Sequence, residues 1–113
     1  DSSTSRGLGD VYKRQNDMSK GYWISSHRAP ADPEKYAAYV KLAIPAVEGA
    51  GGRFLVKGGE VLAKENGLNQ RTTVIEFDTF DDAKKAYESQ SYQLALKELE
   101  GGAERDLRIV EGA

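Results

Sequence analysis

The chain has 113 residues, of which 39% are hydrophobic and 30% are charged, and its formal net charge is −2. This length suits one domain, and the small negative charge argues against nucleic acid or an anionic membrane surface as a partner. The sequence has no cysteine, which excludes disulfides and thiolate chemistry. No apolar run reaches the roughly 18 residues of a membrane span and no secretory signal is found, so we expect a cytoplasmic protein.

The first seventeen residues differ in composition from the rest of the chain. They are rich in serine, glycine and charged residues, and the only methionine, Met18, follows them directly. The run over 9–15 also resembles translated adapter sequence. We therefore expect residues 1–17 to be a disordered or non-native leader, with a native flexible arm as the alternative. Residues 18–113 are expected to form a single domain.

The domain opens with a predicted strand and a clearly marked helix. Residues 21–27 form the strand, since they begin with bulky, β-prone side chains. Asp32 is a suitable N-cap for the helix, and Pro33 suits its first position. Pro45 predicts a kink, and glycines end the helix soon after it. The apolar stripe of this helix consists of Tyr36, Val40, Ile44 and Val47.

The remainder of the chain predicts two strands, two helices and a final strand. The two strands cover 53–57 and 71–77, with a polar turn between them. Thr79 caps the next helix, and Ser91 caps a short helix that ends at two glycines. The last strand covers 106–111. This order predicts an α+β, ferredoxin-like βαββαβ fold, with a four-stranded antiparallel sheet and helices on one face.

Large apolar side chains occupy both faces of the predicted strands. Phe54 and Val56 are expected to share one face, opposite Leu55. Trp23, Val74 and Val110 likewise oppose apolar neighbours. Helices cover one face, and a bare second face would expose a larger apolar patch than monomers usually tolerate. We therefore predict a homodimer, with scattered surface aromatics as the simpler alternative.

An ordered set of short segments carries a resemblance to a known family. The segments are Gly21-Tyr22-Trp23-Ile24, Asp32-Pro33-Glu34, Gly51-Gly52-Arg53-Phe54-Leu55-Val56-Lys57-Gly58-Gly59 and Ile109-Val110-Glu111-Gly112. Together they resemble the domain-of-unknown-function family 1330, within the dimeric α/β-barrel superfamily. The resemblance implies a ferredoxin-like subunit whose sheet packs on that of its twin to form a barrel. It implies no established activity.

Seven residues are candidates for contact with a ligand, and none is assigned a catalytic role. His27, the only histidine, ends the first strand and titrates near neutrality, so it suits a general base or a ligand contact. Arg53 and Arg71 begin strands, and an arginine binds carboxylate or phosphate with two parallel hydrogen bonds. Glu65 could pair with Arg71 or act as an acid or base. The other candidates are Tyr39, Ser89 and Tyr92.

Structural roles are the commoner alternatives for residues of these types. A histidine at a strand end, a surface salt bridge and a tyrosine with a packed ring are ordinary features of a domain. Glu76 lies within an apolar strand, so it needs a partner if it points inward. One histidine and no cysteine provide too few ligands for the usual metal sites, so we expect no metal and no cofactor.

Three functions remain open from the sequence. The first is a homodimer that binds a small molecule in a pocket between sheet and helices. The second is a cofactor-independent enzyme of the monooxygenase or isomerase type, with His27 or Glu65 as base. The third is a structural or regulatory interaction module without a ligand. A pocket with converging polar groups favours the first two, and a filled interior favours the third.

Overall fold

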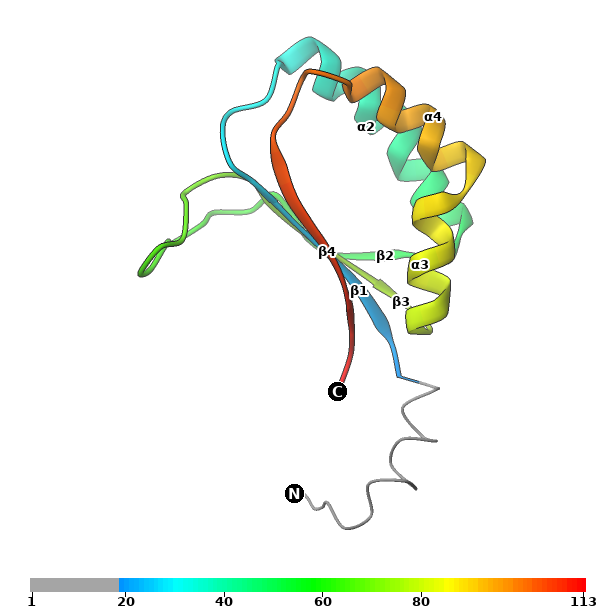
Figure 1. Ribbon diagram of the computed structural model, residues 1–113. Helices are drawn as coiled ribbons and strands as arrows, with labels where there is room; N and C mark the ends of the chain where they lie inside the picture. Colours follow the sequence, from blue (N-terminus) through cyan, green and yellow to red (C-terminus); the bar gives the residue numbers. More distant parts are fainter. Residues whose placement is uncertain (1–18) are drawn as a thin grey trace.

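A computed structural model describes residues 19–113 of the chain (Figure 1). The predicted leader over 1–17 lies outside these described residues. None of the described helices is long and apolar enough to cross a membrane. In chain order, the described elements are β1 (Gly21–His27), α2 (Pro33–Gly49), β2 (Arg53–Lys57), β3 (Thr72–Phe77), α3 (Phe80–Glu88), α4 (Gln90–Leu99) and β4 (Arg105–Glu111).

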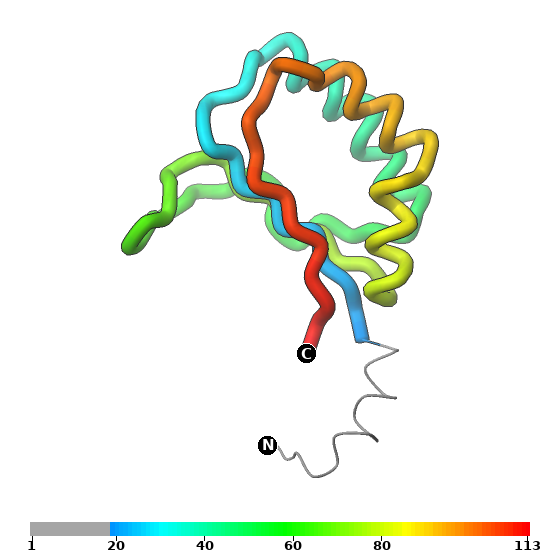
Figure 2. Tube along the Cα trace, in the orientation of Figure 1, coloured from blue at the N-terminus to red at the C-terminus, as the bar shows by residue number. Residues whose placement is uncertain are grey.

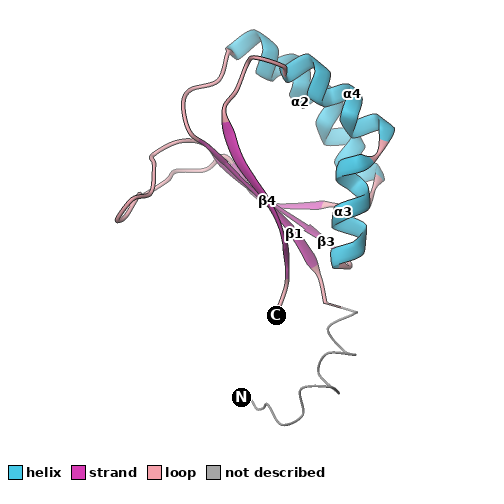
Figure 3. Cartoon of the chain, in the orientation of Figure 1, coloured by secondary structure: helices cyan, strands magenta, loops and turns pink. Residues whose placement is uncertain are grey.

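The four strands form one sheet in the order β2-β3-β1-β4, and every neighbouring pair is antiparallel. The three helices lie together on one side of this sheet (Figure 3). The predicted ferredoxin-like α+β fold is therefore confirmed, with α3 and α4 as two successive helices before the last strand. The sheet has two different faces as a result, one towards the helices and one away from them.

The first two helix starts follow from their capping residues. The carboxylate of Asp32 accepts hydrogen bonds from two backbone N–H groups of the first turn of α2, at 3.0 and 3.1 Å. The hydroxyl of Thr79 accepts one from the first turn of α3, at 3.0 Å. Each side chain satisfies donors that have no partner inside the helix, which confirms both predicted N-caps. Pro45 lies inside α2 and is exposed.

The start of α4 differs from the prediction. Ser89, not Ser91, is its N-cap, and the Ser89 hydroxyl accepts from the backbone N–H of Tyr92 at 3.3 Å. Ser89 has an extended backbone, with φ −64° and ψ 148°, which interrupts the helical conformation between α3 and α4. Ser91 consequently lies inside the first turn of α4, where its side chain is exposed.

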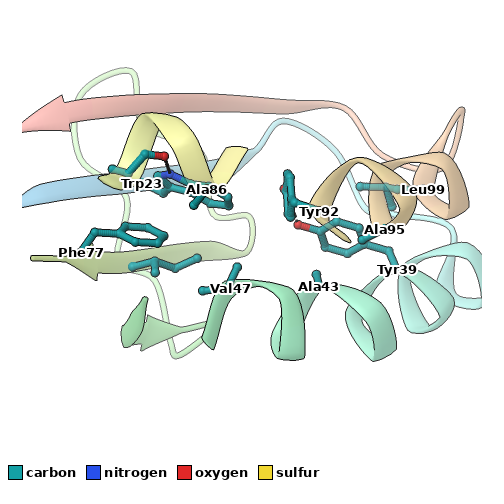
Figure 4. Packing of buried hydrophobic residues seen from close by; sticks show 11 residues of the cluster. Trp23, Tyr39, Ala43, Val47, Phe77, Ala86, Tyr92, Ala95 and Leu99 are labelled. Atoms are coloured by element: carbon teal, nitrogen blue, oxygen red, sulfur yellow. Dashed lines mark hydrogen bonds between the residues drawn. The ribbon is translucent and has the colours of Figure 1, made fainter. Parts of the chain in front are cut away.

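The core lies between the helices and the sheet (Figure 4), and Trp23 of β1 is among its largest fully buried side chains. The indole N–H of Trp23 donates to the backbone carbonyl of Ala83 in α3 at 2.8 Å, so the one polar atom of this buried ring has a partner. The ring also packs on Phe77 and Tyr92. Gly21 lets α3 approach β1 closely, since a Cβ there would lie 2.7 Å from the Cβ of Ala83.

A β-bulge in β2 changes the faces of its residues. Phe54 pairs with Ile75, but after the irregularity Val56 pairs with Val74, which faces the other way. The expectation that Phe54 and Val56 share a face is therefore wrong, because the extra residue in the bulge shifts the alternation by one. Phe54 and Lys57 lie on the helix-facing side of the sheet, and Val56 lies on the outer side.

The outer face of the sheet, which no described helix covers, carries a group of large apolar side chains beside charged ones such as Arg53 and Glu76. The large apolar side chains are those of Tyr22, Ile24, Val56, Val74 and Val110. Val56 is 41% exposed and Val110 38%. The loop over 58–71 projects beyond the sheet (Figure 2), and it exposes Leu62 and Leu68. The prediction of apolar groups on both faces of the sheet is confirmed.

Candidate functional site

A cavity lies between α2 and the helix-facing side of the sheet, with a volume of about 50 Å³. A single water needs about 10–15 Å³ on this measure, so the space suits a few waters or part of a small molecule. Its apolar walls include Trp23, Val47, Phe54 and Ile75. Its polar walls include Ser25, Tyr39, Lys57, Arg71, Thr73, Tyr92 and Arg105.

Three basic residues form a row across one end of the sheet. His27 of β1 is directly opposite Arg105 of β4. On its other side, the backbone N–H of His27 donates to the carbonyl of Arg71 at 2.9 Å. The row therefore runs from Arg71 through His27 to Arg105, and the two arginines reach the cavity. Four residues before His27 on β1, Trp23 lies in an apolar row with Ile75 and Ile109.

Two tyrosines from different helices meet beside Arg105. The hydroxyl oxygens of Tyr39 and Tyr92 are 2.7 Å apart and share a hydrogen bond (Figure 4). Arg105 donates from Nη1 to the Tyr39 hydroxyl at 3.2 Å, and its guanidinium lies 5.0 Å from the centre of the Tyr39 ring. Burial, together with the nearby Tyr39, raises the pKa of Tyr92, so its phenol stays protonated at neutral pH.

Arg71 is held by contacts that leave one of its donors unused. Its guanidinium lies 5.3 Å from the centre of the Tyr36 ring. It also packs against Gly58, whose φ of +74° and lack of a side chain both suit glycine, because a Cβ there would collide with the guanidinium. The Nε atom of Arg71 is buried and has no hydrogen-bond partner in the structure. Such a donor is uncommon in folded proteins.

His27 is buried, with 4% of its surface exposed, and its ring makes an edge contact with Tyr36 at 5.3 Å. Burial lowers the pKa of the imidazole, and the charges of Arg105 and Arg71 lower it further. The ring is therefore neutral at pH 7. It contributes a neutral polar group between two cations rather than a third positive charge.

Arg53 lies on the opposite face of the sheet from the cavity. Its guanidinium contacts Glu76 at 3.0 Å and Asp78 at 3.0 Å. Glu76 points outward, and it also accepts a hydrogen bond from the Tyr22 hydroxyl at 3.1 Å. The hydrogen bond from Arg53 lowers the pKa of Glu76, so the carboxylate is charged at neutral pH. Because Glu76 points outward, it does not need the buried partner that an inward orientation would require.

Glu65 and Ser89 lie away from the cavity walls. Glu65 is exposed in the loop between β2 and β3, with a φ of +53°. Ser89 lies at the junction of α3 and α4, where its hydroxyl donates to the carbonyl of Ala86 at 2.8 Å. Of the seven sequence candidates, the structure brings Tyr39, Arg71 and Tyr92 together at the cavity. His27 lies directly between the arginines of the basic row.

Sequence reasoning missed Arg105 and Lys57 as site residues. The last strand was predicted to begin at residue 106, which left Arg105 in a loop, whereas β4 begins at Arg105. The alternation Arg105, Leu107, Ile109 on one face of β4 was the available signal. Lys57 reaches the helix side only because of the bulge in β2. Its ammonium lies 4.7 Å from the centre of the Phe54 ring.

The side chains gathered at this site suit binding of a polar group more than metal chemistry. Among residues 19–113, no group of three or more histidine, aspartate or glutamate side chains is placed to hold a metal ion. The converging groups are instead donors, supplied by arginine, lysine and tyrosine. The two arginines lie at one end of the cavity, and Trp23 and Ile75 lie towards its other end.

Comparison with solved structures shows the same fold in other proteins. RPA0582, a protein of unknown function from Rhodopseudomonas palustris, has a TM-score of 0.67 at 15% identity, covering 97% of this chain and 95% of that one. An ethyl tert-butyl ether D (EthD) family protein from Bacillus halodurans has a TM-score of 0.55 at 12% identity, covering 83% and 99%. SnoaB, a cofactor-independent oxygenase from Streptomyces nogalater, has a TM-score of 0.55 at 10% identity, covering 84% and 94%.

Identities this low show the fold alone, which is the ferredoxin-like arrangement of a four-stranded antiparallel sheet with helices on one face. No curated protein matches the sequence. The family model for the domain of unknown function DUF1330 matches residues 20–113, nearly the whole of the described chain. The expected resemblance is thereby confirmed, and the chain belongs to the DUF1330 family.

Proposed function

We propose that this protein is a homodimer that binds a small molecule in the cavity between α2 and the sheet. The observation that carries the proposal is that Arg71, which lines the cavity, has a buried Nε donor with no hydrogen-bond partner among residues 19–113. Buried polar groups are nearly always hydrogen-bonded, and an unmade bond costs about 1–3 kcal/mol. A ligand that carries an acceptor atom supplies the missing partner.

Further donors around the cavity support the same reading. Arg105, Lys57 and the hydroxyl of Tyr39 face the space from three different elements, β4, β2 and α2. A few converging polar groups in a largely apolar cavity are typical of small-molecule sites. The volume of about 50 Å³ suits a small ligand, or one end of a larger one.

The outer face of the sheet supports the homodimer. Ile24 and Val74 are opposite one another on the two central strands, and Val56 extends this apolar surface to β2. The helices cover only the other side of the sheet (Figure 3). Association of two copies through this face would remove the apolar surface from water, and two-fold dimers are the commonest way to do so.

Native mass spectrometry of protein purified from cells tests both parts of this proposal. We expect the mass of a dimer with a retained small molecule. Ala43→Leu, at a buried position in the cavity wall, should fill the space and lose the bound mass while the dimer persists. Ala37→Leu is the matched control, because Ala37 is exposed on the same helix, and it should keep both.

Each of the other outcomes contradicts a stated part of the proposal. A monomer with no bound compound contradicts both parts. A dimer with an empty cavity contradicts the binding function and favours an interaction module. Retention of the same compound by Ala43→Leu would place the ligand somewhere other than this cavity.

A further inference from the structure

The cavity has a basic end and an apolar end, set by the rows of the sheet. Arg71 and Arg105 flank His27 at one end. Trp23 lies further along β1, and Ile75 is paired with it on β3. The row between them contains Ser25, paired with Thr73 on one side. A molecule bound along β1 would therefore contact cations at one end, hydroxyls in its middle and an indole ring at its other end.

The cations at the basic end are not neutralised by the protein. Within residues 19–113, no carboxylate forms an ion pair with Arg71 or Arg105. The two arginines instead contact the rings of Tyr36 and Tyr39. Charged groups that are partly removed from water are usually paired, because their desolvation is costly. An anion is the missing partner that this arrangement favours.

The geometry of arginine favours a carboxylate as that anion. An arginine offers Nε–H and one Nη–H as two parallel donors, which match the two oxygens of a carboxylate. On Arg71, the Nε donor of this fork is the one that is buried and unused. A doubly charged phosphate would suit a more polar cavity, whereas most of this wall is apolar.

We infer that the ligand is a small organic monocarboxylate, with its carboxylate against Arg71 and Arg105 and its apolar body against Trp23. This inference rests on the proposed function and specifies the ligand class of the same cavity. The neutral His27 fits the arrangement, since it separates the two arginines without adding charge. The hydroxyls of Ser25 and Thr73 lie between the two ends of the ligand.

Two pairs of near-isosteric probes test this inference on the wild-type protein. Benzoate is compared with benzamide, and butyrate with butyramide, by calorimetric or NMR titration. Each carboxylate should bind roughly tenfold more tightly than its amide, because hydrogen bonds between charged groups are stronger than neutral ones. Inorganic phosphate at the same ionic strength should bind more weakly than benzoate, since it has no apolar body.

Three Arg→Gln variants test which arginines cause the preference for a carboxylate over an amide. Arg71→Gln and Arg105→Gln should bring the ratio of carboxylate to amide affinity close to one. Arg53→Gln is the matched control, because Arg53 lies on the outer face with its own carboxylate partners. This control should preserve the wild-type ratio. If an arginine variant fails to fold, the wild-type comparison still decides the question.

The single histidine provides a second readout that does not depend on affinity. The cations of Arg71 and Arg105 contribute to lowering the pKa of His27. A carboxylate bound between them would offset their charge, so benzoate should raise the pKa of His27 in an NMR titration. Benzamide should leave that pKa unchanged, because it carries no charge.

Equal binding of benzoate and benzamide would overturn the inference while leaving the binding function intact. Tight binding of phosphate with no preference for benzoate would also overturn it, in favour of an inorganic anion site. If no probe binds but the purified protein retains an unrelated neutral compound, the inference fails and the proposed function stands. If no probe binds and nothing is retained, both fail together.

Discussion

Tyr39 and Tyr92 join two helices and the edge of the sheet through a single chain of hydrogen bonds. The Tyr39 hydroxyl bonds both Tyr92 and Arg105, and Arg105 also interacts with the Tyr92 hydroxyl. Tyr92 is 1% exposed and Tyr39 is 7% exposed, so water cannot readily replace a lost partner. The two residues are chemically alike, but their removal should have unequal consequences.

We predict that Tyr39→Phe lowers the free energy of unfolding by about 1–3 kcal/mol, because it removes the hydroxyl that bonds both the buried Tyr92 and Arg105. Tyr92→Phe should cost less, about 0.5–1.5 kcal/mol, since the Tyr39 hydroxyl keeps its bond to Arg105. Urea unfolding of the two variants measures the difference. Equal losses, or a larger loss for Tyr92→Phe, would show that the chain of bonds is arranged differently.

Residue type was enough to suggest some of the residues that line the cavity and not the rest. Arg71 was a candidate because arginine binds carboxylate or phosphate with two parallel hydrogen bonds, and Tyr39 and Tyr92 were candidates for which a structural role is commoner. Arg105 and Lys57 are equally suited by type, but the face on which they lie depends on where β4 starts and on a bulge in β2. Both features are set by pairing with distant strands, so local sequence does not reveal them.

Among the elements, the junction of α3 and α4 shows where local rules succeed and fail. Sequence patterns located both helices and the capping role of Thr79. They placed the second cap at Ser91 because the serines at 89 and 91 both suit an N-cap. The structure selects Ser89, whose extended backbone separates the two helices, and α4 then buries Tyr92 and Ala95. The choice is made by packing of the apolar face, not by the cap itself.

We predict that Ser89→Ala lowers the free energy of unfolding by about 1 kcal/mol, because the first turn of α4 loses its side-chain acceptor. Ser91→Ala is the matched control, since Ser91 is exposed inside the same helix, and its effect should stay within about 0.5 kcal/mol. Chemical denaturation compares the two. A larger loss of stability in Ser91→Ala than in Ser89→Ala would mean that Ser91, as the sequence predicts, is the N-cap of α4.

On the scale of the whole molecule, the order of elements was predictable because each has a strong local signal. The N-cap at Asp32 and the β-prone run at the start of β1 are such signals, and both are confirmed. The apolar character of both sheet faces was also predictable, since it needs only the alternation of a strand. The cavity was not, because its size depends on how side chains from α2, α4 and all four strands fit together.

The outer face leads to a prediction about assembly. Val74 lies on the central strand β3, opposite Ile24 and next to Val56, so it should be near the middle of a sheet-to-sheet interface. Val74→Lys should weaken dimerisation at least about 100-fold, because burying an unpaired ammonium costs several kcal/mol. In a separated subunit the same lysine reaches water from the open face, so the fold itself should persist. Analytical ultracentrifugation over a range of concentrations measures the change.

Leu94→Lys is the control for this prediction, since Leu94 is 50% exposed on α4, on the helical side of the molecule. It introduces the same charge and should leave the dimer unchanged. If Leu94→Lys separates the subunits and Val74→Lys does not, the copies associate through their helices. The apolar sheet face would then remain open to water in the dimer, contrary to the argument that burial of this face drives assembly.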